Sequence, residues 1–311
     1  MKKLLLHLGY PKCASTTLQN GLFYALHKGG AVNFIGRAWE SDYFGPAENK
    51  KDYKAWFESV FLDQDEATAR RVHERAPLSF SEDKLNLISE GLFLMREQHD
   101  DQLVIPEKIG AYFRDKVDEM QLLFVIRSQQ TMIMSYFVQN YRHIKESTFS
   151  AFLDNHLTST KPKNFKIFNL HDVLSRYAQV VGKDNLRIVY YEDLLNDREA
   201  FQRDLGAVLG VGPDLVGSLI EKPHLNKTKK EEKGSVVRKF NRLSVGEKVK
   251  RVLATGDPRA ASSSAPREKI VVPPITEEQK RVIFDTFRDG NLKIADELGL
   301  DKERMERYGY F

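Results

Sequence analysis

The sequence has a single cysteine, Cys13, no long apolar run and little excess charge. One cysteine excludes an intramolecular disulfide and argues against a zinc site, which usually takes several Cys or His ligands. No stretch approaches the roughly 20 apolar residues of a membrane-spanning helix. The apolar run after Met1 ends at His7 and is too short for a signal peptide. A formal charge of +4 over 311 residues is far below that of a dedicated nucleic-acid binder. We therefore expect a cytoplasmic protein that needs no metal, spans no membrane and binds no nucleic acid.

The order of apolar and amphipathic segments predicts the fold class. Four short apolar runs are each followed by a segment with helical periodicity. The predicted strands are residues 3–8, 85–88, 121–126 and 186–190, and the predicted helices include residues 106–117, 149–157 and 170–181. Such alternation is typical of an α/β fold with a parallel β-sheet flanked by helices on both faces. We predict one domain over residues 1–311, with a flexible loop at 254–268, where small residues and proline dominate.

The first predicted strand runs into a turn that is suited to bind an anion. Gly9 and Pro11 form the turn, Lys12 follows, and a helix is expected to begin near Ser15. The first backbone N–H groups of a helix lack internal partners, and the helix dipole adds partial positive charge to that of the lysine. Hydroxyl groups after the turn add further donors. The predicted phosphate-binding loop consists of Pro11, Lys12, Cys13, Ala14, Ser15, Thr16 and Thr17.

The spacing in this loop differs from that of a Walker A motif, which needs Gly-x-x-x-x-Gly-Lys-Ser/Thr. Here Gly9 precedes Lys12 by three positions, with no second glycine between them. The segment instead resembles the 5′-phosphosulfate loop of sulfotransferases that use 3′-phosphoadenosine 5′-phosphosulfate (PAPS), where Pro-Lys-x-Gly-Ser/Thr-Thr follows the first strand. The His-x-Gly-x-Pro-Lys opening from His7 and the Thr-x-Leu-Gln close resemble the carbohydrate and bacterial branches of this family. Ala14 stands where the family usually has glycine, so a left-handed backbone there would cost about 1 kcal/mol.

A second motif of the same family follows more than a hundred residues later. Arg127 ends the predicted strand 121–126, and Ser135 lies eight residues further along, in a predicted helix. The resemblance implies that these two residues hold the 3′-phosphate of PAPS, a role for which the planar guanidinium fork is suited. An arginine paired with an acid and a solvent-facing serine are the alternative. The resemblance also places Asn226 and Lys227 in a basic loop over the nucleotide, although an ordinary solvated charge run fits these residues equally well.

Sulfuryl transfer needs a cation beside the leaving oxygen and a base beside the attacking hydroxyl. Lys12 is the candidate cation, with a solvated surface lysine as the alternative. Glu90 is the candidate base, because carbohydrate sulfotransferases often place a glutamate at a comparable strand end. Its apolar neighbours would raise the pKa of its carboxyl group. The alternative is that Ser89 and Glu90 begin a helix. His7 is a further candidate base, although a histidine inside a strand is more often structural.

The resemblance implies a P-loop-NTPase-like sulfotransferase fold and a defined reaction. The enzyme would transfer the sulfuryl group from PAPS, the co-substrate, to a hydroxyl or, as a second choice, an amine of a carbohydrate or glycolipid. The product would be adenosine 3′,5′-bisphosphate, and no metal would be needed. Two alternatives remain open, a P-loop-like nucleotide or small-molecule kinase and a non-catalytic nucleotide-binding protein of the same fold. We also expect a positive loop to stabilise the thiolate of Cys13.

Overall fold

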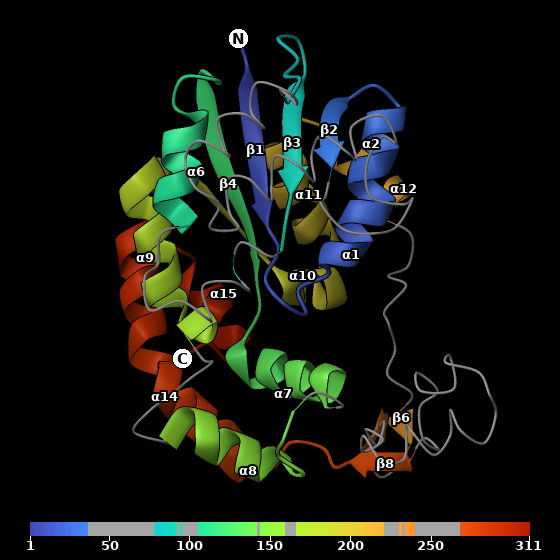
Figure 1. Cartoon of the computed structure of the whole chain (residues 1–311), viewed down its shortest axis with the longest axis vertical. Coiled ribbons are helices and arrows are strands. Elements are labelled where there is room, and N and C mark those ends of the chain that lie inside the picture. The colour runs from blue at the N-terminus through green and yellow to red at the C-terminus, as the bar shows by residue number, and fades with distance from the viewer. Residues whose placement is uncertain are drawn as a thin grey trace, which may run out of the picture.

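A parallel five-stranded sheet forms the centre of the structure (Figure 1). The computed structural model describes residues 1–36, 78–91, 94, 105–141, 144–158, 166–220, 230–231, 234–239 and 268–311. The strand order is β2-β3-β1-β4-β5. The strands are β1 (Lys3–Leu8), β2 (Val32–Gly36), β3 (Leu85–Ser89), β4 (Glu119–Ile126) and β5 (Leu186–Tyr190). The four predicted strands and the α/β class are confirmed, while β2 lies in residues 32–46, a segment whose sequence fits either a loop or short strands.

The central strands are buried on both faces. β1 pairs with β3 on one side and with β4 on the other. The side chains from Leu4 to Leu8 in β1 and from Leu122 to Ile126 in β4 are at most 1% exposed. A parallel strand that is covered on both faces reads as a continuous apolar run, which is why the sequence predicted these strands. Each large apolar side chain buried in this way stabilises the fold by roughly 1.5–3 kcal/mol.

Helices cover both faces of the sheet (Figure 1). The chain moves toward one edge from β1 to β2 and toward the other from β3 to β4 and from β4 to β5, so right-handed crossovers place the connecting helices on opposite faces. The first crossover contains α1 (Ser15–Thr17), the π-helical segment η1 (Leu18–Phe23) and α2 (Tyr24–Lys28), and η1 packs against α12 (Pro213–Leu219). The other crossovers contain α6 (Ile105–Phe113) and α9 (Leu170–Val181), which pack against each other.

The remaining helical elements follow or connect the strands of the sheet. They are α7 (Gln129–Asn140), α8 (Phe149–Leu153), the π-helical η2 (Asp154–Thr158), the 3₁₀ segments η3 (Lys166–Phe168) and η4 (Lys183–Asn185), α10 (Tyr191–Asn196), α11 (Arg198–Leu209), α14 (Glu277–Leu298) and α15 (Lys302–Arg307). A separate antiparallel sheet consists of β6 (Lys230–Glu231), β7 (Gly234–Lys239) and β8 (Glu268–Val272).

The helices predicted over 106–117, 149–157 and 170–181 are all present, and the first ends earlier than predicted. The helix expected over 106–117 ends at Phe113, because the N–H groups of Lys116 and Val117 both turn back to the Phe113 carbonyl. Except for Glu268, which begins β8, the loop predicted at 254–268 lies outside the described residues. The single domain over 1–311 stays a prediction. Every helix in the described part of the chain is too short or too polar to cross a bilayer.

Candidate functional site

The loop between β1 and α1 is tightly curled. Lys12 and Ala14 both have left-handed backbone conformations, with φ of 66° and 60°. The Tyr10 carbonyl accepts hydrogen bonds from the Cys13 N–H at 3.3 Å and from the Ser15 hydroxyl at 3.4 Å. The helix begins at Ser15 as predicted. The loop therefore requires the left-handed conformation considered for Ala14 and takes it without the usual glycine.

Two glycines let this loop approach the end of the neighbouring strand β3. A Cβ atom on Gly9 would lie 2.6 Å from the Ser15 hydroxyl oxygen, and one on Gly91 would lie 3.2 Å from the Gly9 carbonyl oxygen. Between these contacts, the Glu90 N–H donates a hydrogen bond of 3.0 Å to the His7 carbonyl. Glu90 is therefore held directly beside the loop, at the same edge of the sheet.

Arg127, which follows β4, connects this loop to α7. Its Nη1 donates a hydrogen bond of 3.0 Å to the Lys12 carbonyl, and its Nε donates one of 2.9 Å to the Thr131 hydroxyl. The guanidinium also lies over the Tyr191 ring, 4.5 Å from its centroid. Ser135 is four residues after Thr131 and therefore lies on the same face of α7, one turn further along.

Two cationic residues, Lys12 and Arg127, thus lie together at the carboxyl ends of β1 and β4. The chain leaves these two strands in opposite directions, and α/β sheets bind ligands where the strand order reverses. Burial lowers the pKa of Lys12 below its usual range, and the Arg127 guanidinium lowers it further. This arrangement concentrates positive charge at the loop before any anion is bound.

Comparison with known proteins identifies the fold that carries these residues. No protein-family model and no curated protein matches the chain. A sulfotransferase from Alicyclobacillus acidocaldarius matches 97% of this chain and 97% of its own, with a TM-score of 0.52 at 12% sequence identity. The chain has a sulfotransferase fold.

Two more distant matches are also sulfotransferases. A mouse sulfotransferase complexed with PAP matches 74% of this chain and 67% of its own, with 12% identity and a TM-score of 0.38. The sulfotransferase domain of an olefin synthase from Synechococcus PCC 7002 matches 93% of this chain and 96% of its own, with 14% identity and a TM-score of 0.38.

Within this sulfotransferase fold, the expectation for Cys13 is wrong. Its side chain is completely buried, and its sulfur lies 3.5 Å from the Pro11 carbonyl oxygen and 3.9 Å from the Met132 sulfur. Burial raises the pKa of the thiol, and this effect exceeds the opposing effect of Arg127 and Lys12. The loop is positive, but the thiol points away into the core and is not activated.

Glu90 and His7 are both completely buried. The His7 ring packs edge-on against Phe23, and its Nδ1 lies 2.7 Å from the hydroxyl oxygen of Ser89. The same hydroxyl accepts a hydrogen bond of 2.7 Å from Nε2 of Gln19. The Ser89 side chain thus belongs to a buried cluster with His7 and Gln19.

Residues distant in sequence support the backbone that follows Arg127, and their contacts could not be predicted from the sequence. Glu192 accepts hydrogen bonds from the Ser128 N–H at 2.8 Å and from the Tyr310 hydroxyl at 3.2 Å, and burial raises the pKa of its carboxyl group. The Ser128 hydroxyl donates to the Gly309 carbonyl at 3.2 Å. Asn291 bonds both Gln129 and the Tyr310 carbonyl. The Tyr-Glu-Asp sequence at 191–193 is recognisable, but it does not indicate which residues these side chains contact.

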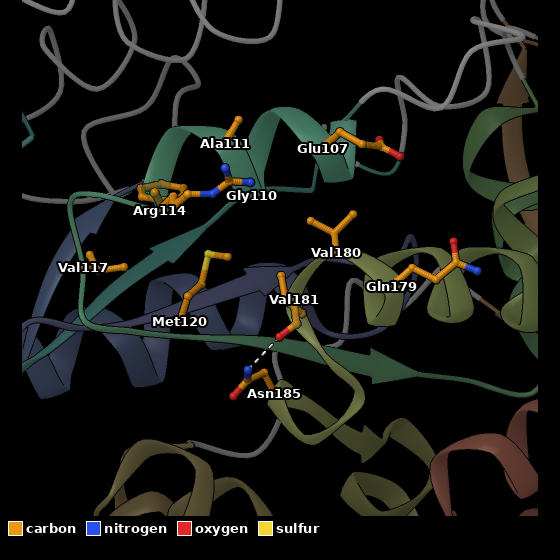
Figure 2. A pocket seen from close by; sticks show the side chains of 11 residues that line it. Glu107, Gly110, Ala111, Arg114, Val117, Met120, Gln179, Val180, Val181 and Asn185 are labelled. Atoms are coloured by element: carbon orange, nitrogen blue, oxygen red, sulfur yellow. Dashed lines mark hydrogen bonds between the residues drawn. The ribbon is translucent and has the colours of Figure 1, made fainter.

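A cavity of about 480 Å³ lies at the opposite edge of the sheet, between α6 and α9. In Figure 2, Glu107 on α6 and Arg114, which follows the last residue of that helix, lie across the cavity from Gln179 and Val180 on α9. Its floor includes Met120, near the start of β4. Lys12 and Arg127 follow the other ends of their strands and do not line this cavity.

Two further points complete the site. Asn226 and Lys227, the predicted nucleotide-loop residues, lie outside the described residues. Among the residues that the structure describes, no three His, Cys, Asp or Glu side chains are grouped closely enough to hold a metal ion.

Proposed function

We propose that this protein is a PAPS-dependent sulfotransferase that transfers a sulfuryl group to a hydroxyl of a carbohydrate or glycolipid. The hydrogen bond of 3.0 Å from Arg127 to the Lys12 carbonyl carries the proposal. It brings together two cationic residues that follow neighbouring strands of a sulfotransferase fold. PAPS has phosphate groups on both ends of its ribose, so a single molecule offers one anionic group to the loop and another to the arginine.

The residues divide between the two ends of this nucleotide. Residues 11–17 would hold the 5′-phosphosulfate through backbone N–H groups, hydroxyls and the Lys12 ammonium group. Cys13 would contribute only its backbone, because its thiol is buried. Arg127 and Ser135 would hold the 3′-phosphate, with Thr131 and Tyr191 orienting the guanidinium group. Asn226 and Lys227 are proposed to close over the nucleotide.

The chemistry is a direct displacement at sulfur. The acceptor oxygen attacks the sulfur atom and forms a new S–O bond, while the bond from sulfur to the bridging phosphate oxygen breaks. The electron pair of that bond stays on the phosphate of adenosine 3′,5′-bisphosphate, beside Lys12. Glu90 takes the proton of the acceptor hydroxyl. In this structure the Glu90 side chain is fully covered, so the acceptor must displace the atoms that cover it.

We also propose a carbohydrate acceptor, a cytoplasmic location and a reaction without a metal. The acceptor class follows from the resemblance of residues 7–19 to the carbohydrate and bacterial branches. The metal-free reaction follows from the balance of charges, since Lys12 and Arg127 supply the positive charge that a kinase takes partly from magnesium.

Nucleotide binding tests the proposal first. Calorimetry with adenosine 3′,5′-bisphosphate in the presence of a metal chelator should detect one site per chain. Arg127→Ala should weaken binding about tenfold to a hundredfold, because charge-assisted hydrogen bonds to phosphate are worth about 1.5–3 kcal/mol. Arg176→Ala is the matched control, since that arginine of α9 pairs with Glu107 of α6 and has no contact with the loop or with Arg127 among those described. No uptake by the folded wild-type protein, or uptake only of ATP with magnesium, would refute the proposal.

Turnover tests the catalytic residues and the acceptor class. With PAPS and a panel of oligosaccharides, Lys12→Ala should abolish transfer, and Glu90→Gln should lower it about a hundredfold to ten-thousandfold to a measurable residual rate. Glu90→Gln should leave the affinity for the bisphosphate unchanged, because the carboxylate acts on the acceptor. Full activity of Glu90→Gln would remove it as the base. Transfer to simple phenols but to no sugar in the panel would contradict the carbohydrate acceptor.

A further inference from the structure

Three polar side chains are buried together behind the phosphate-binding loop. His7 of β1, Gln19 of η1 and Ser89 of β3 are each at most 1% exposed. The Ser89 hydroxyl oxygen lies 2.7 Å from both His7 Nδ1 and Gln19 Nε2, so it is the centre of the cluster. Gln19 Nε2 also reaches the Ser89 carbonyl oxygen at 3.4 Å. The cluster therefore connects three elements that are distant in sequence.

An apolar trio could fill the same space at a lower desolvation cost. Buried polar groups must be hydrogen-bonded to avoid a penalty, and such networks define positions more sharply than apolar contacts do. Gln19 moreover lies in the π-helical segment, an unusual local geometry that is frequent at functional sites. The polar cluster therefore indicates that the backbone around Ser89 has to be held in one defined position.

Each member of the cluster lies next to a part of the proposed site. His7 precedes the loop, and its carbonyl accepts the Glu90 N–H at 3.0 Å. Gln19 lies two residues after Thr17, the last residue of the proposed phosphate-binding loop. Ser89 is bonded directly to Glu90 in the chain. The side chain of Ser89 fixes one side of the Glu90 backbone, and the contact between Gly91 and Gly9 fixes the other.

We propose that His7, Gln19 and Ser89 are positioning residues that hold Glu90 at a defined place beside the phosphate-binding loop. The inference rests on the proposed function, in which Glu90 removes the proton of the acceptor hydroxyl as the S–O bond forms. It also explains His7 and Gln19, which flank the loop sequence and are assigned no contact with phosphate. Their side chains meet at the serine that precedes the base.

Kinetics of Ser89→Ala test the inference. This variant removes the hydroxyl to which both other side chains bond. We expect kcat to fall about tenfold to a hundredfold, as for other residues that orient a catalytic group. The affinity for adenosine 3′,5′-bisphosphate should stay within about twofold of wild type, since the loop itself is intact. His7→Asn, which can keep a nitrogen near the position of Nδ1, should retain more kcat than His7→Leu.

A buried polar residue on the same strand provides the structural control. Asn86 lies at the other end of β3, is equally buried, and bonds the Lys3 carbonyl and the Ser81 backbone. Asn86→Ala should lower the melting temperature without the specific loss of kcat. If Ser89→Ala and Asn86→Ala change kcat equally at equal loss of stability, the Ser89 cluster is merely structural and the inference is refuted.

A double-mutant cycle separates the inference from the proposed function. If Ser89 acts only through Glu90, adding Ser89→Ala to Glu90→Gln should not lower the residual rate further. An additive loss would overturn the inference while leaving sulfuryl transfer in place. If the wild-type protein binds the bisphosphate and transfers sulfate but Ser89→Ala keeps full kcat, only the inference fails. If the wild-type protein binds no bisphosphate, both fail together.

Discussion

Ala14 offers a direct test of the phosphate-binding loop, because its backbone takes a conformation that an L-amino acid adopts at a cost. Its φ and ψ are 60° and 14°, and its carbonyl accepts the Leu18 N–H at 3.0 Å, so the loop cannot relax without losing the helix start. Glycine has no Cβ and adopts the same angles freely. We therefore expect Ala14→Gly to raise the free energy of unfolding.

The size of the effect follows from two opposing terms. The left-handed conformation costs an alanine about 1–2 kcal/mol, which glycine recovers. Glycine also makes the unfolded chain more flexible, which costs about 0.4–1 kcal/mol. The net expectation is a gain of about 0.5–1 kcal/mol, or roughly 2 °C in melting temperature for a chain of this size.

The same substitution elsewhere should have the opposite sign. Ala207 is exposed inside the regular helix α11, where replacing alanine by glycine costs about 0.5–1 kcal/mol. Urea denaturation followed by far-UV circular dichroism, with equal m-values for all three proteins, should place Ala14→Gly above wild type and Ala207→Gly below it. If both variants unfold at lower urea concentration than wild type, the loop is not strained at Ala14 and the reasoning is wrong.

Three further predictions follow from the charges and thiol near the site. Asp193→Ala should lower the free energy of unfolding by about 3 kcal/mol in urea titrations, because it leaves the largely buried Arg304 without a main partner. Asp285→Ala, in a pair with both side chains more than half exposed, should change it by less than about 0.5 kcal/mol. A comparable loss in both variants would contradict this reading. Calorimetry should show that the affinity for adenosine 3′,5′-bisphosphate falls as the pH rises, because the Lys12 ammonium group loses its charge above its pKa. Since the pKa of Lys12 is lowered, this fall should begin at a lower pH than it would for an ordinary lysine. Lys12→Arg should remove this dependence, and an unchanged profile would exclude Lys12 as its source. Because Cys13 is buried and the pKa of its thiol is raised, a thiol reagent should label it in urea but not in the native protein, and rapid native labelling would show that it is accessible.

The parts of the fold that depend on local pattern could be predicted from the sequence. The central strands are apolar because they are buried on both faces, and this same pattern is visible in residues 3–8 and 121–126. The possible strain at Ala14 was also visible, because the residue stands where glycine is usual in a motif of fixed spacing. The strand β2 has no such pattern and owes its place to pairing with β3.

The parts that depend on pairing across long sequence separations could not be predicted. Position in the chain suggests an activated thiol at Cys13, but only tertiary packing shows that its side chain points into the core. His7 and Ser89 are 82 residues apart, and nothing local in either segment indicates the other. Likewise, the Tyr-Glu-Asp run is visible in the sequence, whereas its partners Tyr310 and Arg304 are more than a hundred residues away.

The contact between Ser128 and Gly309 has a consequence for how the protein is made. These residues are 181 positions apart, and the nearby bond from Asn291 to the Tyr310 carbonyl closes the same region. On the ribosome, β1, β3 and β4 emerge well before residue 309 is translated. The contacts that support the backbone after Arg127 can therefore form only after residue 309 has been translated, so a nascent chain that already has its central strands should bind nucleotide poorly until the segment around Gly309 has left the exit tunnel.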